Sequence, residues 1–171
     1  MNAVEIESAV SDLVLQPFDR DEFPFEFLQA FGNKNTALKR LRTGNNTVSD
    51  VSGGVLQRNN IHIAVCEAGT VGETLKALRT SPSTTKAKAK FILATDGQTL
   101  EAEELAGGET IACAYPDFPN HFGFFLPLAG ISTIKEIKDK GTFVALVDRA
   151  PSVNDNSVRD LYVAGNNFAL G

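Results

Sequence analysis

Apolar positions in the first third of the chain recur at helical spacing. Residues 4–15 place their valines and leucines near one face of a helix, and Pro17 ends that pattern. A phenylalanine-rich stretch, residues 23–31, repeats it and stops at Gly32, a residue typical of helix C-termini. Asn35 or Thr36 can cap a third short helix that ends before Gly44, with its leucines inward and its lysine and arginines outward. We therefore predict three helices before any strand.

The pattern then changes to short apolar runs separated by turn residues. We predict strands at residues 55–57, 61–66, 91–95, 99–105 and 111–115, with a tight turn at Asp96-Gly97. Thr70 and Glu73 match a capping box that would begin a helix ending before Ser81-Pro82-Ser83. This order predicts an α/β (α+β) fold with a mixed sheet flanked by helices.

The last part of the chain is harder to interpret. Thr133 and Glu136 match a second capping box, and residues 143–147 have the composition of a strand. Residues 151–157 have the composition of a polar loop, and residues 166–171 contain no recognisable element. We therefore expect a domain over residues 1–140 and a tail over 141–171.

The distribution of charge along the chain is more informative about function than the overall composition. The 171 residues are 43% hydrophobic and 22% charged, enough to bury one core, and the net charge of −5 argues against a nonspecific nucleic-acid binder. That charge is uneven, with −6 over residues 1–33, +7 over 34–90 and −6 over 91–171. The middle third is therefore a candidate basic surface.

Basic residues of this middle third fall in predicted turns and exposed helix positions, where phosphate contacts are commonly made. Three lysines alternate with alanine and would point to one side of an extended chain. A solvated basic face, without a nucleic-acid partner, explains the same pattern. The candidate nucleic-acid-binding residues are Lys34, Lys39, Arg40, Arg42, Arg58, Lys86, Lys88 and Lys90.

Metal and cofactor signals are weak. Cys66 has no further Cys or His at zinc spacing, and His62 is interpreted as a core or sheet residue. No glycine-rich phosphate loop is present. The acidic cluster Glu101, Glu103 and Glu104 is interpreted as a solvated sheet edge. We expect no metal site.

The sequence also predicts a compartment. The first residues are acidic where a signal peptide would be basic, and the longest nearly apolar stretch, residues 122–131, is about half of the roughly 20 residues that a membrane span needs. We expect a cytoplasmic protein without a membrane partner.

Four segments resemble a known family: FPFEFLQAFGNKNTALKRLR, NNIHIAVCEAG, TTKAKAKFILATDGQTLEAEEL and HFGFFLPLAGIS. Together they are similar to the N-terminal domain of MmeI-like restriction-modification enzymes and related adenine-specific DNA methyltransferases, over residues 4–138. The resemblance implies a PD-(D/E)xK nuclease-like fold, double-stranded DNA as partner, and a parent enzyme that continues into a methylating domain.

The nuclease chemistry implied by the resemblance needs an Asp near one strand and Glu-x-Lys on the next, so that two carboxylates hold Mg²⁺ beside a lysine. Asp50 could take the first position. The next strand places Ala64 and Cys66 at the Glu and Lys positions, and Glu67 is expected to point to the opposite face. The resemblance therefore implies a lost active site, with Asp50 and Glu67 as remnants.

Methylation is not expected from this chain alone. It contains no Asn-Pro-Pro-Tyr/Phe tetrapeptide and no glycine-rich loop for S-adenosylmethionine, so that cofactor would belong to the parent enzyme, of which this chain would be a truncated part. Our main hypothesis is a non-catalytic, DNA-associated module of a methyltransferase or phage-defence enzyme.

Two alternatives stay open. One is an active Mg²⁺-dependent endonuclease that uses Asp50 with a partner such as Glu67. The other is a protein-interaction domain that contacts a methyltransferase domain or subunit and never DNA. The aromatic stretch of residues 118–125 motivates it, since part of that stretch could form an exposed apolar patch.

Overall fold

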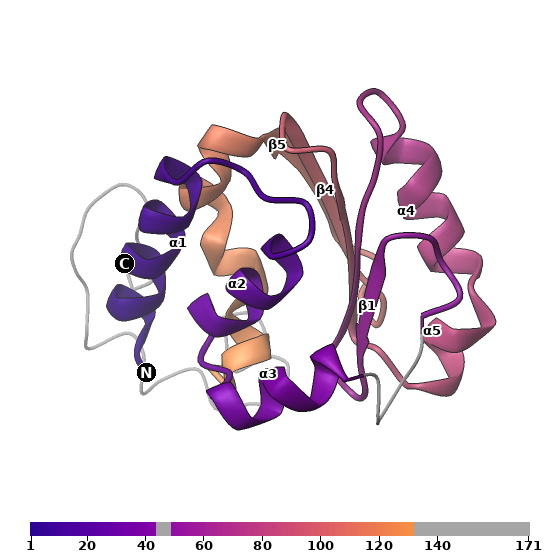
Figure 1. The fold of residues 1–171 in the computed structure, drawn as a ribbon, viewed down its shortest axis with the longest axis horizontal. Helices are drawn as coiled ribbons and strands as arrows, with labels where there is room; N and C mark the ends of the chain where they lie inside the picture. Colours follow the sequence, from indigo (N-terminus) through magenta and orange to yellow (C-terminus); the bar gives the residue numbers. More distant parts are fainter. Residues whose placement is uncertain (44–48, 132–171) are drawn as a thin grey trace. The chain divides into compact units, whose positions relative to one another are not determined.

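The computed structural model describes residues 1–43 and 49–131 (Figure 1). The chain divides into two compact units, Met1–Ala129 and Gly130–Gly171, and every described helix and strand belongs to the first. The expected boundary at residue 140, the helix expected after Thr133 and the strand expected at residues 143–147 lie outside the described residues.

Three helices precede the sheet, as predicted. They are α1 (Ala3–Leu15), α2 (Phe23–Ala30) and α3 (Asn35–Arg42). The helix α1 begins with a capping box, in which the Asn2 side chain accepts from the Glu5 backbone N–H and the Glu5 carboxylate accepts from the Asn2 N–H, both at 2.9 Å.

The sheet has five strands, in spatial order β1-β2-β3-β4-β5. Their bounds are β1 Gly54–Gln57, β2 Ile61–Val65, β3 Phe91–Thr95, β4 Thr99–Glu104 and β5 Thr110–Ala114. All neighbours pair antiparallel except β2 and β3, which are parallel and are connected through α4 (Val71–Thr80) and α5 (Pro82–Lys86). The mixed α/β fold is therefore confirmed, whereas α5 was not predicted.

Helices cover both faces of the sheet, which Figure 1 shows nearly edge on. On one face α4 packs on β2, β3 and β4 over a small aliphatic core that includes Ala64, Leu75 and Leu78. On the other lie α1, α2 and a 3-10 segment, η1 (Tyr115–Ala129). This second core is aromatic: the Phe27 ring lies 5.9 Å from Phe118 and 5.2 Å from Phe125.

The aromatic stretch of residues 118–125 contributes two phenylalanines to this core, while Phe122 and Phe124 are half-buried, so the expected apolar patch is at most small. Phe118 and Phe125 are fully buried. Among the described residues, the large hydrophobic side chains that are exposed are Met1, Val4 and Leu15. The sequence could not separate a covered aromatic cluster from an exposed one, because both have the same composition.

The acidic strand is also not an edge. β4 pairs with β3 and β5, so the strand that carries Glu101, Glu103 and Glu104 is internal to the sheet. Arg79 of α4 reaches across to Glu103, with 2.6 Å between Nη2 and Oε1. The sequence of a polar strand face is the same whether its carboxylates are solvated or paired with a basic side chain of a neighbouring helix. This explains why the strand was wrongly interpreted as an edge.

The predicted capping box of α4 does not form. Thr70 is the N-cap residue, but its hydroxyl donates to the backbone oxygen of Glu67 at 2.7 Å instead of accepting from the helix. The start of the helix was still predicted correctly, since Val71, Leu75 and Leu78 are buried as its apolar stripe requires.

Candidate functional site

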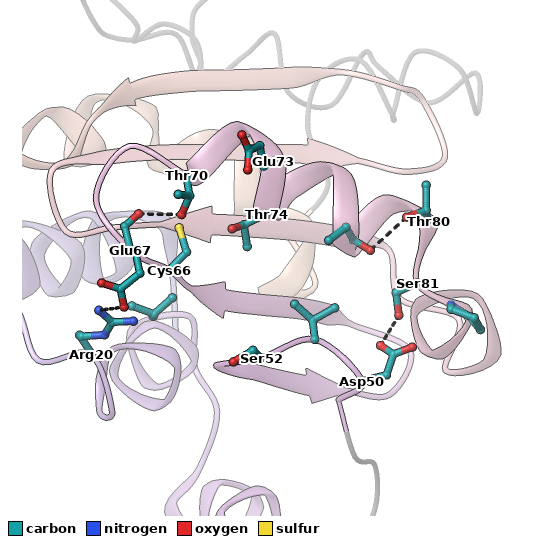
Figure 2. Close-up of a pocket in the computed structure, with 14 residues that line it drawn as sticks. Arg20, Asp50, Ser52, Cys66, Glu67, Thr70, Glu73, Thr74, Thr80 and Ser81 are labelled. Carbon is teal, nitrogen blue, oxygen red and sulfur yellow. Dashed lines mark hydrogen bonds and ion pairs between the residues drawn. The ribbon is translucent and has the colours of Figure 1, made fainter.

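A pocket of about 640 Å³ opens between α4 and the loop that leads into β1 (Figure 2). Its walls come from residues 50–52, residues 65–67, the exposed side of α4 as far as Pro82, and Arg20. Hydroxyl groups are frequent in its lining, which includes Ser52, Thr70, Thr74, Thr80 and Ser81. The pocket begins where β2 ends, beside the first turn of α4.

Asp50 and Glu67, the two carboxylates singled out from the sequence, both line this pocket, but they stand at its opposite ends, as Figure 2 shows. Asp50 lies in the loop before β1, and its carboxylate accepts a hydrogen bond at 2.5 Å from the hydroxyl of Ser81, the residue before α5. That bond, together with further bonds from Ser83, holds the pKa of Asp50 below its ordinary value. The carboxylate therefore secures α5 to the loop before β1.

Glu67 lies at the other end and pairs with Arg20, with 2.9 Å between Oε2 and Nη1. Both side chains are more than half exposed, so this ion pair contributes little to stability. Glu67 was expected to point away from the Asp50 side. Because β2 ends at Val65, the strand alternation no longer fixes its direction, and its side chain reaches the pocket.

Ala64 and Cys66, which the resemblance placed at the Glu and Lys positions of a nuclease, lie at and just after the end of β2. Ala64 is fully buried beneath α4, and Cys66 is half-buried with Sγ 3.6 Å from the backbone oxygen of Thr95. Among the 14 residues that line the pocket there is no lysine, and its one basic side chain, Arg20, is paired.

His62 is fully buried, as expected, and it connects the pocket loop to α5. Its Nε2 lies 2.6 Å from Ser49 Oγ and its Nδ1 lies 2.7 Å from Thr84 Oγ1. The Thr84 hydroxyl also lies 2.8 Å from Leu78 O, and the Ser49 hydroxyl 3.1 Å from Val51 O. A neutral ring donates to one of these two hydroxyls and accepts from the other. Burial lowers the pKa of His62 to about 4, so the ring is neutral at pH 7.

Gly53 brings the pocket loop against β2. Its φ is +72°, and a Cβ at this position would lie 2.5 Å from the backbone oxygen of Val65. The Val65 N–H donates to Gly53 O at 3.3 Å. Only glycine fits this close approach, so the Gly53-Gly54 pair serves packing, in agreement with the absence of a phosphate loop.

Four of the candidate nucleic-acid-binding residues lie near one another at the end of the sheet where the parallel strands β2 and β3 begin. Arg58 lies in the turn between β1 and β2, and Lys86, Lys88 and Lys90 lie between the last residue of α5 and β3. Two backbone bonds join these segments: Asn59 N–H donates to Ala87 O, and Lys90 N–H donates to Asn60 O, both at 2.8 Å. All four basic side chains are exposed.

Lys34 is linked to the same turn. It follows Asn33, whose side-chain oxygen accepts from the Gln57 amide at 2.7 Å, and Gln57 in turn accepts from the Asn60 amide. We call this set of five exposed side chains the basic end: Lys34, Arg58, Lys86, Lys88 and Lys90.

The other three candidates lie on α3. Lys39 and Arg40 are exposed. Arg42 is already engaged: its guanidinium donates twice to Glu22, at 2.9 and 2.6 Å, and lies 4.1 Å from the centre of the Phe25 ring. These hydrogen bonds raise the pKa of Arg42 and lower that of Glu22.

Two other classes of feature are absent from residues 1–43 and 49–131. Those residues contain no group of three His, Cys, Asp or Glu side chains that could hold a metal ion. Within the same ranges, no helix is long and apolar enough to cross a membrane.

Comparison with known proteins identifies the family. The family model described as the MmeI N-terminal domain matches residues 1–150. DNA methyltransferase A of Bacillus subtilis (strain 168) is 21% identical over 155 residues, which are 91% of this chain and 18% of that protein. The chain thus spans less than a fifth of this curated relative, and no solved structure matches it. The chain belongs to the family of MmeI N-terminal domains.

Proposed function

We propose that this domain is a non-catalytic, DNA-associated module of an adenine-specific DNA methyltransferase or restriction-modification enzyme. One observation carries the non-catalytic part: the pocket that contains both remnant carboxylates has no lysine in its lining, and each carboxylate is engaged at a different end. Family membership and the basic middle third support the association with DNA.

A nuclease-like origin of the fold is part of this proposal. The loop before β1 carries Asp50, β2 carries Ala64, and Cys66 follows one residue after β2 ends and packs against the same small core as Ala64. Asp50 and Cys66 line the same pocket. That arrangement suits the placement of Asp and Glu-x-Lys in a PD-(D/E)xK site, with the acid and the lysine replaced.

Metal-dependent cleavage needs two carboxylates that share one Mg²⁺ and a lysine beside them. In this chain the Asp50 carboxylate accepts bonds from residues at the start of α5, and Glu67 pairs with Arg20. We therefore propose no binding site for S-adenosylmethionine or Mg²⁺ at Asp50 or Glu67. Adenine methylation would be carried out by another part of a parent enzyme, and that part would be a protein partner.

The test is a plasmid assay. Supercoiled plasmid is incubated with the 171-residue chain and Mg²⁺ or Mn²⁺, beside the Asp50→Ala variant. We expect no nicking by either protein, because the pocket lacks the lysine. Nicking by the original chain that disappears in Asp50→Ala would contradict the proposal and establish the endonuclease alternative.

A further inference from the structure

We infer that the basic end binds the phosphate backbone of duplex DNA, and that the pocket faces no DNA. This inference rests on the proposed function and specifies which surface carries it. The basic end lies where β2 and β3 begin, whereas the Arg20–Glu67 pair lies where β2 ends. The basic end and the Glu67 end of the pocket are therefore at opposite ends of β2. Asp50, at the other end of the pocket, contacts Ser81 just before α5, whose last residue is Lys86.

Backbone geometry supports the choice of this surface. Among the described residues other than glycine, positive φ is found at Asn59 (+61°) and Lys88 (+56°), which stand in the two segments that the Asn59–Ala87 hydrogen bond joins. A lysine in this conformation is uncommon and costs free energy, which is typical of positions kept for function. The fixed backbone holds Arg58 and Lys88 on adjoining turns.

Charge excludes the pocket as the phosphate surface. Its lining carries three carboxylates, Asp50, Glu67 and Glu73, against the single Arg20. Phosphate groups would be repelled there. The basic end has its own acidic border, because Leu105 N–H donates to Lys90 O and brings the β4–β5 turn, with Glu104 and Glu109, beside Lys90. Of the five residues, Lys90 should therefore contribute least.

Duplex DNA fits this surface better than a single strand. Proteins that hold single strands combine basic grooves with aromatic side chains on which bases stack. Residues 33–36, 57–60 and 86–90 contain no aromatic residue. Lysines and arginines on turns are suited to phosphate contacts that do not depend on base sequence.

The test measures binding of the whole chain to a fluorescent duplex by anisotropy, over a series of salt concentrations. The main variant is the triple charge reversal Arg58→Glu, Lys86→Glu, Lys88→Glu. The matched pair is Lys88→Glu and Lys76→Glu, which change the net charge equally. Lys76 is exposed on α4, outside the basic end. Thermal unfolding checks that each variant folds.

Each lost phosphate contact should reduce the slope of log K against log salt by about 0.9, so the triple variant should lose about three units of slope. We expect Lys88→Glu to weaken binding several-fold more than Lys76→Glu, and a single strand of equal length to bind more weakly than the duplex. Equal effects of Lys88→Glu and Lys76→Glu, with wild-type binding intact, would overturn the inference alone. Absence of wild-type duplex binding would overturn the proposed function as well.

Discussion

The pocket and the basic end use their polar side chains differently. Around the pocket, Asp50, His62 and Glu67 each have a partner within the fold. At the basic end, hydrogen bonds fix the backbone of residues 59, 60 and 90, while the lysine and arginine side chains are exposed. The polar groups of the pocket are thus used within the fold, whereas the basic side chains at the basic end stay exposed to solvent.

This difference separates stability from binding. Substitutions around the pocket should change the free energy of unfolding and leave DNA affinity as it is. Substitutions at the basic end should do the reverse, because exposed side chains contribute little to stability. Any residue that changes both quantities would show that the two regions are coupled.

The largest expected effect concerns His62. Its pKa is about 4 in the folded chain against 6.5 ordinarily, so between these values the unfolded state binds more protons. The free energy of unfolding should fall by about 3 kcal/mol as pH decreases from 6.5 to 4. Urea unfolding at several pH values measures this loss.

A His62→Gln variant is the control for that measurement, since it keeps a polar side chain but removes the titration. Its stability should depend less on pH in this window than that of the original chain. Identical pH profiles for the two proteins would contradict the burial of a neutral His62.

Gly53 gives the next largest effect. Alanine at this position would need a positive φ and would meet the backbone oxygen of Val65, so Gly53→Ala should destabilise the chain by about 2 kcal/mol. Gly72 is the matched glycine: it lies in α4 with open space around it, and Gly72→Ala should stabilise by about 0.5 kcal/mol. Thermal melts of both variants test this contrast, and equal melting temperatures would refute it.

Arg42 should give the smallest effect. Its guanidinium is engaged by Glu22 and Phe25, so Arg42→Ala should slightly lower the melting temperature, less so at high salt. Duplex affinity should fall less than in Lys88→Glu, which carries a larger change of charge at the basic end. If Arg42→Ala weakens DNA binding as strongly as Lys88→Glu, the phosphate surface extends onto α3.

Much of the fold could be predicted because long apolar patterns determine which elements form. The helices of the first third, the five strands and the start of α4 all follow from periodicity. The five-residue α5 was missed because Ser81-Pro82-Ser83 has the composition of a chain break, yet Ser81 and Pro82 begin a short helix. Periodicity also could not tell the internal strand β4 from an edge.

The site was only partly predictable. Asp50 and Glu67 were singled out from their positions in the sequence, but their partners, Ser81 and Arg20, lie 31 and 47 residues away and could not be predicted. A signal for the basic end was present in the sequence. Arg58 stands three residues before β2, and Lys88 stands three residues before β3. Because β2 and β3 are parallel and Ile61 lies opposite Phe91, residues that precede the two strands by the same number of positions lie at the same end of the sheet.

The most direct test of the DNA surface is amide hydrogen exchange of the whole chain with and without a saturating DNA duplex. We expect added protection at residues 57–60 and 86–90, and none at residues 50–52 or 65–74. Protection confined to the pocket residues, with the basic end unchanged, would contradict the assignment of DNA to the basic end.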